Sequence, residues 1–230
     1  MIEDIGIDED LTSLGDGYHL IQKKSGFRFS VDPVILADFF KEQKSGKVLD
    51  IGTGNGIIPI LLLKKKGNWD ITGIEIQEET AKLAERNLIL NHLEENVRIL
   101  VGDVKELKEG NSFDYIISNP PYMELDGKKQ NLDEAKLISR HEVKLTLEEL
   151  VENAKRLLKP RGKFFLVHRS HRFLDIAKAM EKNGFSLQRV KFVYYSEGRD
   201  ANLVLVEAQK GKKCKFIVEE PLFLEKYNGV

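Results

Sequence analysis

Val48-Leu-Asp-Ile-Gly-Thr-Gly-Asn-Gly56 is the stretch of sequence on which the fold depends. Its apolar start predicts a buried strand over residues 47–52, and its glycines predict a tight turn into a helix over residues 57–66. Because glycine has no Cβ, the backbone of this turn can approach a bound nucleoside closely. The dinucleotide fingerprint G-x-G-x-x-G fails, because Ile57 or Pro59 takes the third glycine position in the two possible frames. No Gly-Lys-Ser/Thr follows, which excludes a P-loop.

Short β-rich runs alternate with helical patterns along the rest of the chain, as in a wound α/β sheet. Further strands are predicted over residues 70–75, 97–101, 113–118, 163–168, 185–195 and 201–208, and further helices over 78–91, 147–158 and 170–183. Pro160 and Gly162 should stop the helix before the fifth strand, and Gly184 should stop the last helix. The final two strands have no helix between them, so they should pair antiparallel. The fold class is therefore α/β, with a sheet of about seven strands of which the last is antiparallel.

The residues before this sheet predict a small extension. Residues 11–22 fit a hairpin about the turn Gly15-Asp16-Gly17. Asp32 as N-cap and Pro33 as the first helical residue predict a helix that runs through Phe40. We therefore expect a hairpin-and-helix extension over residues 1–46 and a single compact domain over 47–230, a size that one core can support.

Composition excludes several classes of protein. Hydrophobic residues make up 41% and charged residues 32%, as in ordinary globular proteins, and the longest apolar run, residues 57–63, is too short to cross a bilayer. The acidic first ten residues do not resemble a secretory signal, so a cytoplasmic protein without a membrane partner is expected. The single cysteine, Cys214, excludes an intrachain disulfide and a cysteine-rich zinc site. The five histidines show no ligand spacing, so no metal is predicted.

Charge is unevenly distributed along the chain. Residues 155–215 carry 16 Lys and Arg against 5 Asp and Glu, a net charge of +11 that leaves −12 for the rest. Such a segment could present a basic surface to a polyanion. Solvated helix faces with scattered charges explain the same numbers, so this asymmetry only supports a nucleic-acid partner that other features indicate.

Two carboxylates follow the second and third predicted strands. Glu75 lies about 20 residues beyond the glycine turn. In a wound sheet this position places a carboxylate beside the ribose of the ligand, where it can accept hydrogen bonds from the two ribose hydroxyls. Its alternative is a solvated surface charge. Asp103 ends the next strand, where it could accept a hydrogen bond from an adenine amino group, or could cap a helix that starts at Val104.

Asn119-Pro-Pro-Tyr122 follows the fourth predicted strand, and two adjacent prolines fix the backbone where it leaves the sheet. An amine conjugated to a ring is a poor nucleophile because its lone pair is delocalised. The Asn119 side-chain carbonyl and the Pro120 backbone carbonyl could accept its two hydrogens and stabilise the positive charge that develops on it. Tyr122 could stack on the planar group. The motif alone could also be an ordinary turn, but four ligand-type elements on consecutive strand ends favour a site.

Together these motifs resemble the class I methyltransferase fold in its amino-methylating branch. Further segments resemble bacterial tRNA (adenine-6-amino) methyltransferases that modify position 37 of a valine tRNA, namely Phe27-Arg-Phe-Ser-Val-Asp32, Leu36-Ala37, Arg140-His-Glu142, Asn202-Leu-Val-Leu-Val-Glu207 and Pro221-Leu222. The resemblance covers nearly the whole chain, although the chain stops at Val230, where relatives often run a little further.

This resemblance implies S-adenosyl-L-methionine as cofactor, an adenine in tRNA as target and the anticodon stem-loop as the RNA contact. It implies that Asp50, Gly52, Gly54, Gly56, Glu75 and Asp103 bind the cofactor, that Arg28 and Ser30 lie near its methionine end, and that Asn119, Pro120 and Tyr122 hold the target base. A monomer is expected. Residues 123–140 form a long polar stretch that predicts either a substrate lid or simple disorder.

Three alternatives remain open at this point. A protein glutamine methyltransferase shares the Asn-Pro-Pro-Tyr corner but usually carries a separate helical N-terminal domain, for which about 46 residues are too few. A guanine-methylating enzyme often has Phe where this chain has Tyr122. A non-catalytic RNA-binding module could keep the fold without turnover, but the intact Asp50, Glu75, Asp103 and Asn119 argue against it.

Overall fold

A central sheet dominates the computed structural model, which describes residues 5–24, 30–65, 68–122, 145–211, 213 and 215–227. Within these residues the strand order is β10-β8-β9-β7-β6-β3-β4-β5, and β11 also pairs with β8. The strands are β3 (Gly46–Ile51), β4 (Trp69–Glu75), β5 (Val97–Val101), β6 (Phe113–Ser118), β7 (Leu158–Arg169), β8 (Phe185–Tyr194), β9 (Ala201–Lys210), β10 (Ile217–Val218) and β11 (Leu222–Phe223).

The seven predicted strands are all present, as β3 to β9. β9 runs antiparallel to both of its neighbours, β7 and β8, whereas the pairs among β3, β4, β5, β6 and β7 are parallel. The prediction of an antiparallel last strand is therefore confirmed for the long strands. β10 and β11, of two residues each, pair with the outer edge of β8 and were not predicted.

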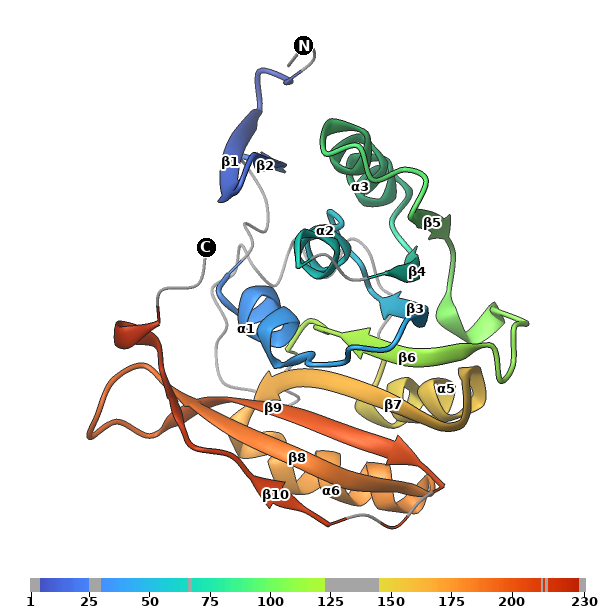
Figure 1. Cartoon of the computed structure of the whole chain (residues 1–230), viewed down its shortest axis with the longest axis vertical. Helices are drawn as coiled ribbons and strands as arrows, with labels where there is room; N and C mark the ends of the chain where they lie inside the picture. Colours follow the sequence, from blue (N-terminus) through green and yellow to red (C-terminus); the bar gives the residue numbers. More distant parts are fainter. Residues whose placement is uncertain are drawn as a thin grey trace.

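Helices cover both faces of the sheet (Figure 1). They are α1 (Asp32–Phe39), α2 (Ile57–Lys64) and α3 (Glu78–Leu90) on one face, and α5 (Leu147–Leu157) and α6 (Phe173–Lys182) on the other. Successive strand residues feed two separate cores, so that Val48 packs with the first group of helices and Leu49 with the second. Because both faces are buried, the central strands are nearly continuous apolar runs.

β7 begins five residues earlier than predicted. Pro160 and Gly162 lie inside this strand, so the expectation that they separate helix from strand is wrong. Between the pairs Phe113↔Leu158 and Tyr115↔Lys163 the register shifts, and this irregularity takes up a proline that cannot donate to a regular ladder. The helix itself ends at Leu157, one residue before the predicted end.

The N-terminal hairpin forms a separate two-stranded sheet of β1 (Glu9–Gly15) and β2 (Tyr18–Lys23), as predicted. Asn87 of α3 attaches it to the domain, because its Oδ1 accepts from Ile21 N at 2.6 Å and its Nδ2 donates to Ile21 O at 3.1 Å. Asn91 makes the same pair of bonds to the backbone of His19, at 2.8 and 2.7 Å. These side chains satisfy backbone groups of an edge strand that would otherwise lack partners.

α1 joins the extension to the sheet through aromatic packing. The ring of Phe40 lies 4.7 to 5.4 Å from those of Phe165, Trp69 and Tyr115. Trp69 and Tyr115 lie in the amino-terminal halves of β4 and β6, so this packing holds the C-terminal end of α1 against the sheet, away from the carboxyl strand ends that carry the predicted site.

Candidate active site

The carboxyl ends of β5, β4, β3 and β6 are neighbours along one edge of the sheet, as the sequence predicted. Ile51, the last residue of β3, pairs with Ser118, the last residue of β6, and the Ser118 hydroxyl donates to Ile51 O at 2.9 Å. On the other side of β3, Glu75 at the end of β4 pairs with Val101 at the end of β5. The glycine turn and Asn119 therefore follow adjacent strands.

Three glycines in left-handed backbone conformations shape the turn after β3. Gly52, Gly54 and Gly56 have φ angles of 72°, 59° and 82°, which L side chains rarely adopt. A Cβ on Gly52 or Gly54 would meet no atom within 4 Å, so both face open space where a ligand could approach. A Cβ on Gly56 would lie 3.3 Å from Ala84 Cβ, so this glycine allows α2 to pack against α3.

Beside this turn lies a buried carboxyl group without a partner. Among the described residues, the buried side-chain atoms that lack a hydrogen-bond partner are Asp50 Oδ1, Asp50 Oδ2 and Thr53 Oγ1. Burial raises the pKa of Asp50 to about 7; the neighbouring Thr53 side chain opposes this shift, and the charge of Glu75 adds to it by a smaller amount. Unpaired buried acceptors require an explanation, and a ligand that carries hydrogen-bond donors supplies one. The open glycine turn and these acceptors thus fit a bound nucleoside with a cationic group.

Glu75 holds the turn from the end of β4. Its Oε2 accepts from Gly54 N and its Oε1 from Gln77 N, each at 3.0 Å, and the residue is buried. Each carboxylate oxygen has a second lone pair, so a pair of ribose hydroxyls could still be accepted. The predicted ribose contact therefore remains a prediction, and the solvated-charge alternative does not describe this side chain.

Asp103 occupies the helix-cap position that the sequence allowed. Its Oδ1 accepts from Lys105 N at 2.9 Å and so caps the short 3-10 helix η1 (Val104–Glu106). Its Oδ2 lies 3.4 Å from Lys105 Nζ. The cap uses one oxygen only, so the proposed contact with an adenine amino group stays a prediction.

Tyr122 connects the Asn-Pro-Pro-Tyr corner to the N-terminal extension. Its hydroxyl oxygen lies 2.6 Å from Asp32 Oδ2 on α1 and 3.0 Å from Asn119 Oδ1. Burial, and then the negative charge of Asp32, raises the pKa of Tyr122 above its usual range, so the hydroxyl keeps its proton.

The ring of Tyr122 is also in contact with β7. The guanidinium carbon of Arg169 lies 4.8 Å from the ring centroid, and the ring of His168 lies 5.1 Å away. Burial, followed by the charge of Arg172, lowers the pKa of His168 to about 4, so it is neutral. A target base that stacks on Tyr122, as predicted, would have to use the ring face that Arg169 leaves free.

Asp32 does not cap α1, so that prediction is wrong. The N-cap is Val31, and Asp32 is the first residue inside the helix, where its side chain contacts Tyr122 instead. Sequence reasoning therefore found this residue but missed its tertiary role. Ser30 is exposed, and its Oγ accepts from Asp32 N at 3.3 Å. Arg28 and the predicted lid, residues 123–140, lie outside the described residues.

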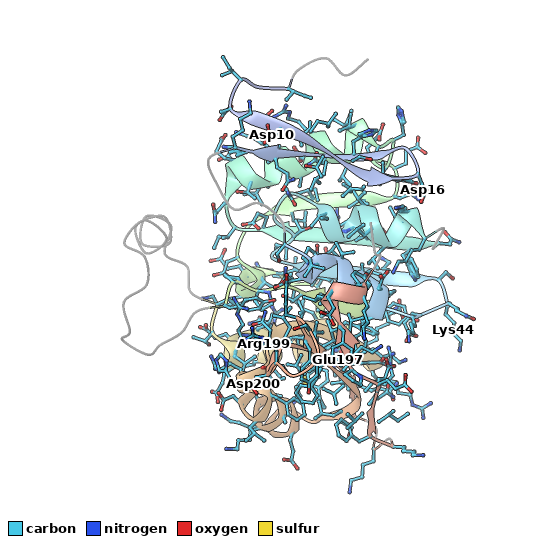
Figure 2. All side chains as sticks on the ribbon, turned by 90° about the vertical axis from the view of Figure 1, so that its left-hand side faces the viewer. Asp10, Asp16, Lys44, Glu197, Arg199 and Asp200 are labelled. Atoms are coloured by element: carbon cyan, nitrogen blue, oxygen red, sulfur yellow. The ribbon has the colours of Figure 1, made fainter. Side chains whose placement is uncertain are left out.

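Many cations of the basic segment 155–215 are neutralised within the fold. The ion pairs are Lys159 with Asp114, Lys163 with Glu42 and Glu207, Arg172 with Asp175, Lys182 with Glu148, Arg189 with Glu207 and Glu219, and Lys191 with Glu219. Arg199 of the β8–β9 turn is exposed and has the exposed acidic residues Glu197 and Asp200 near it in Figure 2, so this turn carries both signs of charge. The segment is therefore less basic as a surface than its sequence indicates.

Two further properties concern the part of the chain that the structure describes. No group of three or more His, Cys, Asp and Glu residues is arranged there to hold a metal ion. No helix in that part is both long and apolar enough to span a bilayer.

Comparison with known proteins gives consistent results. A model of the methyltransferase small domain family matches residues 30–193. A tRNA1(Val) (adenine(37)-N6)-methyltransferase from Tolumonas auensis is 30% identical over 190 residues, which cover 82% of this chain and 79% of the relative. A protein with the same description from a Flavobacteriaceae bacterium is 26% identical, over 88% of this chain and 85% of the relative.

Solved structures share the fold. A protein from Agrobacterium tumefaciens described as a predicted O-methyltransferase superimposes with a TM-score of 0.68 at 22% identity, over 84% of this chain and 86% of its own. A protein from Listeria monocytogenes whose description is that of a class I S-adenosylmethionine-dependent methyltransferase superimposes with a TM-score of 0.60 at 17% identity, over 87% of this chain and 69% of its own.

Proposed function

The chain belongs to the methyltransferase small domain family, and from this premise we propose that it transfers a methyl group from S-adenosyl-L-methionine to the 6-amino group of an adenine in tRNA. The observation that carries the proposal is the adjacency of two elements. The open glycine turn with the unpaired Asp50 follows β3, and Asn119-Pro-Pro-Tyr122 follows β6, the strand beside it. A nucleoside cofactor and an amine acceptor can therefore meet at one sheet edge.

Each side of the site has a chemical task. When bound, S-adenosylmethionine supplies a methyl group activated by a sulfonium. Gly52 and Gly54 would admit it, while Asp50 and Glu75 would accept hydrogen bonds from its donor groups. The Asn119 side-chain carbonyl and the Pro120 carbonyl would accept the two hydrogens of the adenine amine, hold its lone pair towards the methyl group and stabilise the developing positive charge. Tyr122 would exclude water from one side.

The names of the relatives indicate which adenine is modified. Both relatives described above are named for adenine 37 of tRNA1(Val), and we assign the same target here. The anticodon stem-loop would then lie at the carboxyl edge of the sheet. Arg169 and Arg199 lie at the ends of β7 and of the β8–β9 turn on that edge and could meet its phosphates. We propose that a monomer performs the reaction.

The names of the relatives favour adenine over the alternative amine acceptors. A glutamine side chain of a protein substrate would suit the same corner. The elements that the structure describes before β3 are a hairpin and the eight-residue helix α1. These elements are fixed to α3 and to the sheet by the Asn87 bonds and the Phe40 packing, and they form no separate helical domain.

The decisive assay is methyl transfer with a choice of substrates. Purified protein is incubated with labelled S-adenosylmethionine and either total tRNA from a strain that lacks this activity, a tRNA1(Val) transcript, or the same transcript with adenine 37 replaced by guanine. Label should appear as N6-methyladenosine in the first two and be absent from the third. Label in guanosine, or on a release factor added in place of tRNA, would refute the assignment.

A further inference from the structure

The Tyr122 hydroxyl lies between two oxygen atoms, although it has a single proton. Asp32 Oδ2 is 2.6 Å away and Asn119 Oδ1 is 3.0 Å away. The carboxylate can only accept, and the shorter bond to a charged acceptor is the stronger one, so the hydroxyl directs its single hydrogen to Asp32. The amide of Asn119 then faces a hydroxyl oxygen that has only lone pairs to offer. A half-turn of this amide, which exchanges oxygen and nitrogen without other movement, converts that contact into a hydrogen bond.

We propose that Asp32 is a positioning residue for methyl transfer: because it accepts the hydrogen bond that the Tyr122 hydroxyl donates, the hydroxyl oxygen is left to accept from Asn119 Nδ2, which directs Asn119 Oδ1 towards the target amine. This inference rests on the proposed function, in which that oxygen accepts a hydrogen of the adenine amino group. We call this chain of hydrogen bonds from Asp32 through the Tyr122 hydroxyl to Asn119 the relay. It runs from α1 of the extension to the Asn-Pro-Pro-Tyr motif after β6. It gives the extension a role in the chemistry as well as in packing.

The surroundings of Asp32 suit this role. The residue is 9% exposed and its carboxylate lies in the first turn of α1, where the helix dipole favours a negative charge. The adjacent Pro33 restrains the backbone at this position. Tyr122 is restrained in turn by Arg169 over its ring. The hydroxyl, therefore, has a fixed place from which to orient the amide.

The test uses a double-mutant cycle of methyl transfer. In Asp32→Asn the new amide can donate to the tyrosine oxygen, so that the tyrosine proton turns to Asn119 Oδ1 and occupies the acceptor that the substrate needs. We expect kcat to fall ten-fold or more, with the KM for tRNA and the Kd for S-adenosylhomocysteine within three-fold of wild type. Tyr122→Phe removes the hydroxyl, so adding Asp32→Asn to this variant should not lower kcat any further.

The matched control lies on the same helix. Asp38 also accepts a hydrogen bond from a tyrosine hydroxyl, that of Tyr227, but has no contact with Asn119. Asp38→Asn should leave kcat within two-fold of wild type. Multiplicative effects of Asp32→Asn and Tyr122→Phe, or a kcat loss matched by equal losses in thermal stability and cofactor affinity, would overturn the relay.

A second measurement does not depend on the substrate or on the fold of the Asp32 variant. The side-chain amide resonances of Asn119 are assigned by their absence in Asn119→Ala, and should shift in Tyr122→Phe but not in Asp38→Asn. Unchanged resonances in Tyr122→Phe would refute the relay even if tRNA is methylated. Shifted resonances with no label in tRNA would instead uphold the relay and refute the proposed function.

Discussion

Replacing Asp50 by asparagine should stabilise the ligand-free protein at neutral pH and weaken its binding of S-adenosylhomocysteine. The carboxyl is fully buried, has no partner, and has a pKa of about 7 against an ordinary 3.8. The folded protein therefore keeps a proton at this site that the unfolded chain loses above pH 4. Since a raised acid pKa makes the folded state bind more protons, stability contributed at low pH is lost as the pH rises from 4 to 7.

The magnitude follows from the two pKa values. At about 1.4 kcal/mol per ten-fold change in proton affinity, the difference between 3.8 and about 7 costs the folded state up to about 4 kcal/mol above pH 7. Asparagine has nearly the same shape and cannot ionise, so it removes this cost. For a domain of this size the melting temperature should rise by about 10 °C at pH 7.5. The gain should shrink towards pH 5.

Binding should change in the opposite direction. If the carboxylate accepts a hydrogen bond from a cationic group of the cofactor, its loss costs about 1.5–3 kcal/mol, or at least a ten-fold rise in Kd. Denaturant unfolding at pH 5 to 8 and calorimetric titration with S-adenosylhomocysteine measure the two effects. Asp70→Asn, which changes an exposed residue of β4, controls for the loss of one negative charge.

Two results would refute this reasoning. One is a ligand-free Asp50→Asn protein that is less stable than wild type at pH 7.5. The other is a stability difference between the two proteins that does not change from pH 5 to pH 8. Either would mean that a partner in the folded protein stabilises the carboxylate. Burial of this group would then not destabilise the ligand-free protein, and ligand binding would have no such destabilisation to remove.

Three further outcomes are expected. Asn119→Ala should abolish methyl transfer while the Kd for S-adenosylhomocysteine stays within a few-fold, and an equal loss of both would move this residue from the chemistry to the fold. Gly56→Ala should lower the free energy of unfolding by about 1–3 kcal/mol, because of its positive φ and the contact with Ala84. Gly54→Ala should cost less stability, since only its positive φ opposes the change, and should in addition reduce cofactor affinity, since its Cβ enters open space. Thermal melts with and without ligand separate the two effects. Glu207→Gln should destabilise by about 1–2 kcal/mol, because this buried carboxylate is one of two partners of both Lys163 and Arg189, which keep Glu42 and Glu219. We expect kcat to be unchanged, and a stability equal to wild type in chemical denaturation would contradict this prediction.

The local pattern of the sequence was enough to predict the sheet. The strand over residues 113–118, for example, matches β6 residue for residue, because buried parallel strands are short apolar runs between turn signals. The glycine turn was equally readable, since three left-handed φ values at the end of a strand require glycine. Errors came where local and tertiary effects compete. Pro160 ends a helix locally, but a register shift against β6 lets it enter β7.

The sequence by itself determined which residues end the strands, because strand-end chemistry and turn chemistry are encoded within a few neighbouring positions. Only the tertiary structure decided how these residues meet. Asp32 has the local signature of a helix cap, and its contact with Tyr122, 90 residues away, exists because α1 packs beside β6 and β7. Burial likewise decides the state of Asp50, since a pKa depends on the water and charges that the folded chain leaves around a group, and not on its neighbours in sequence.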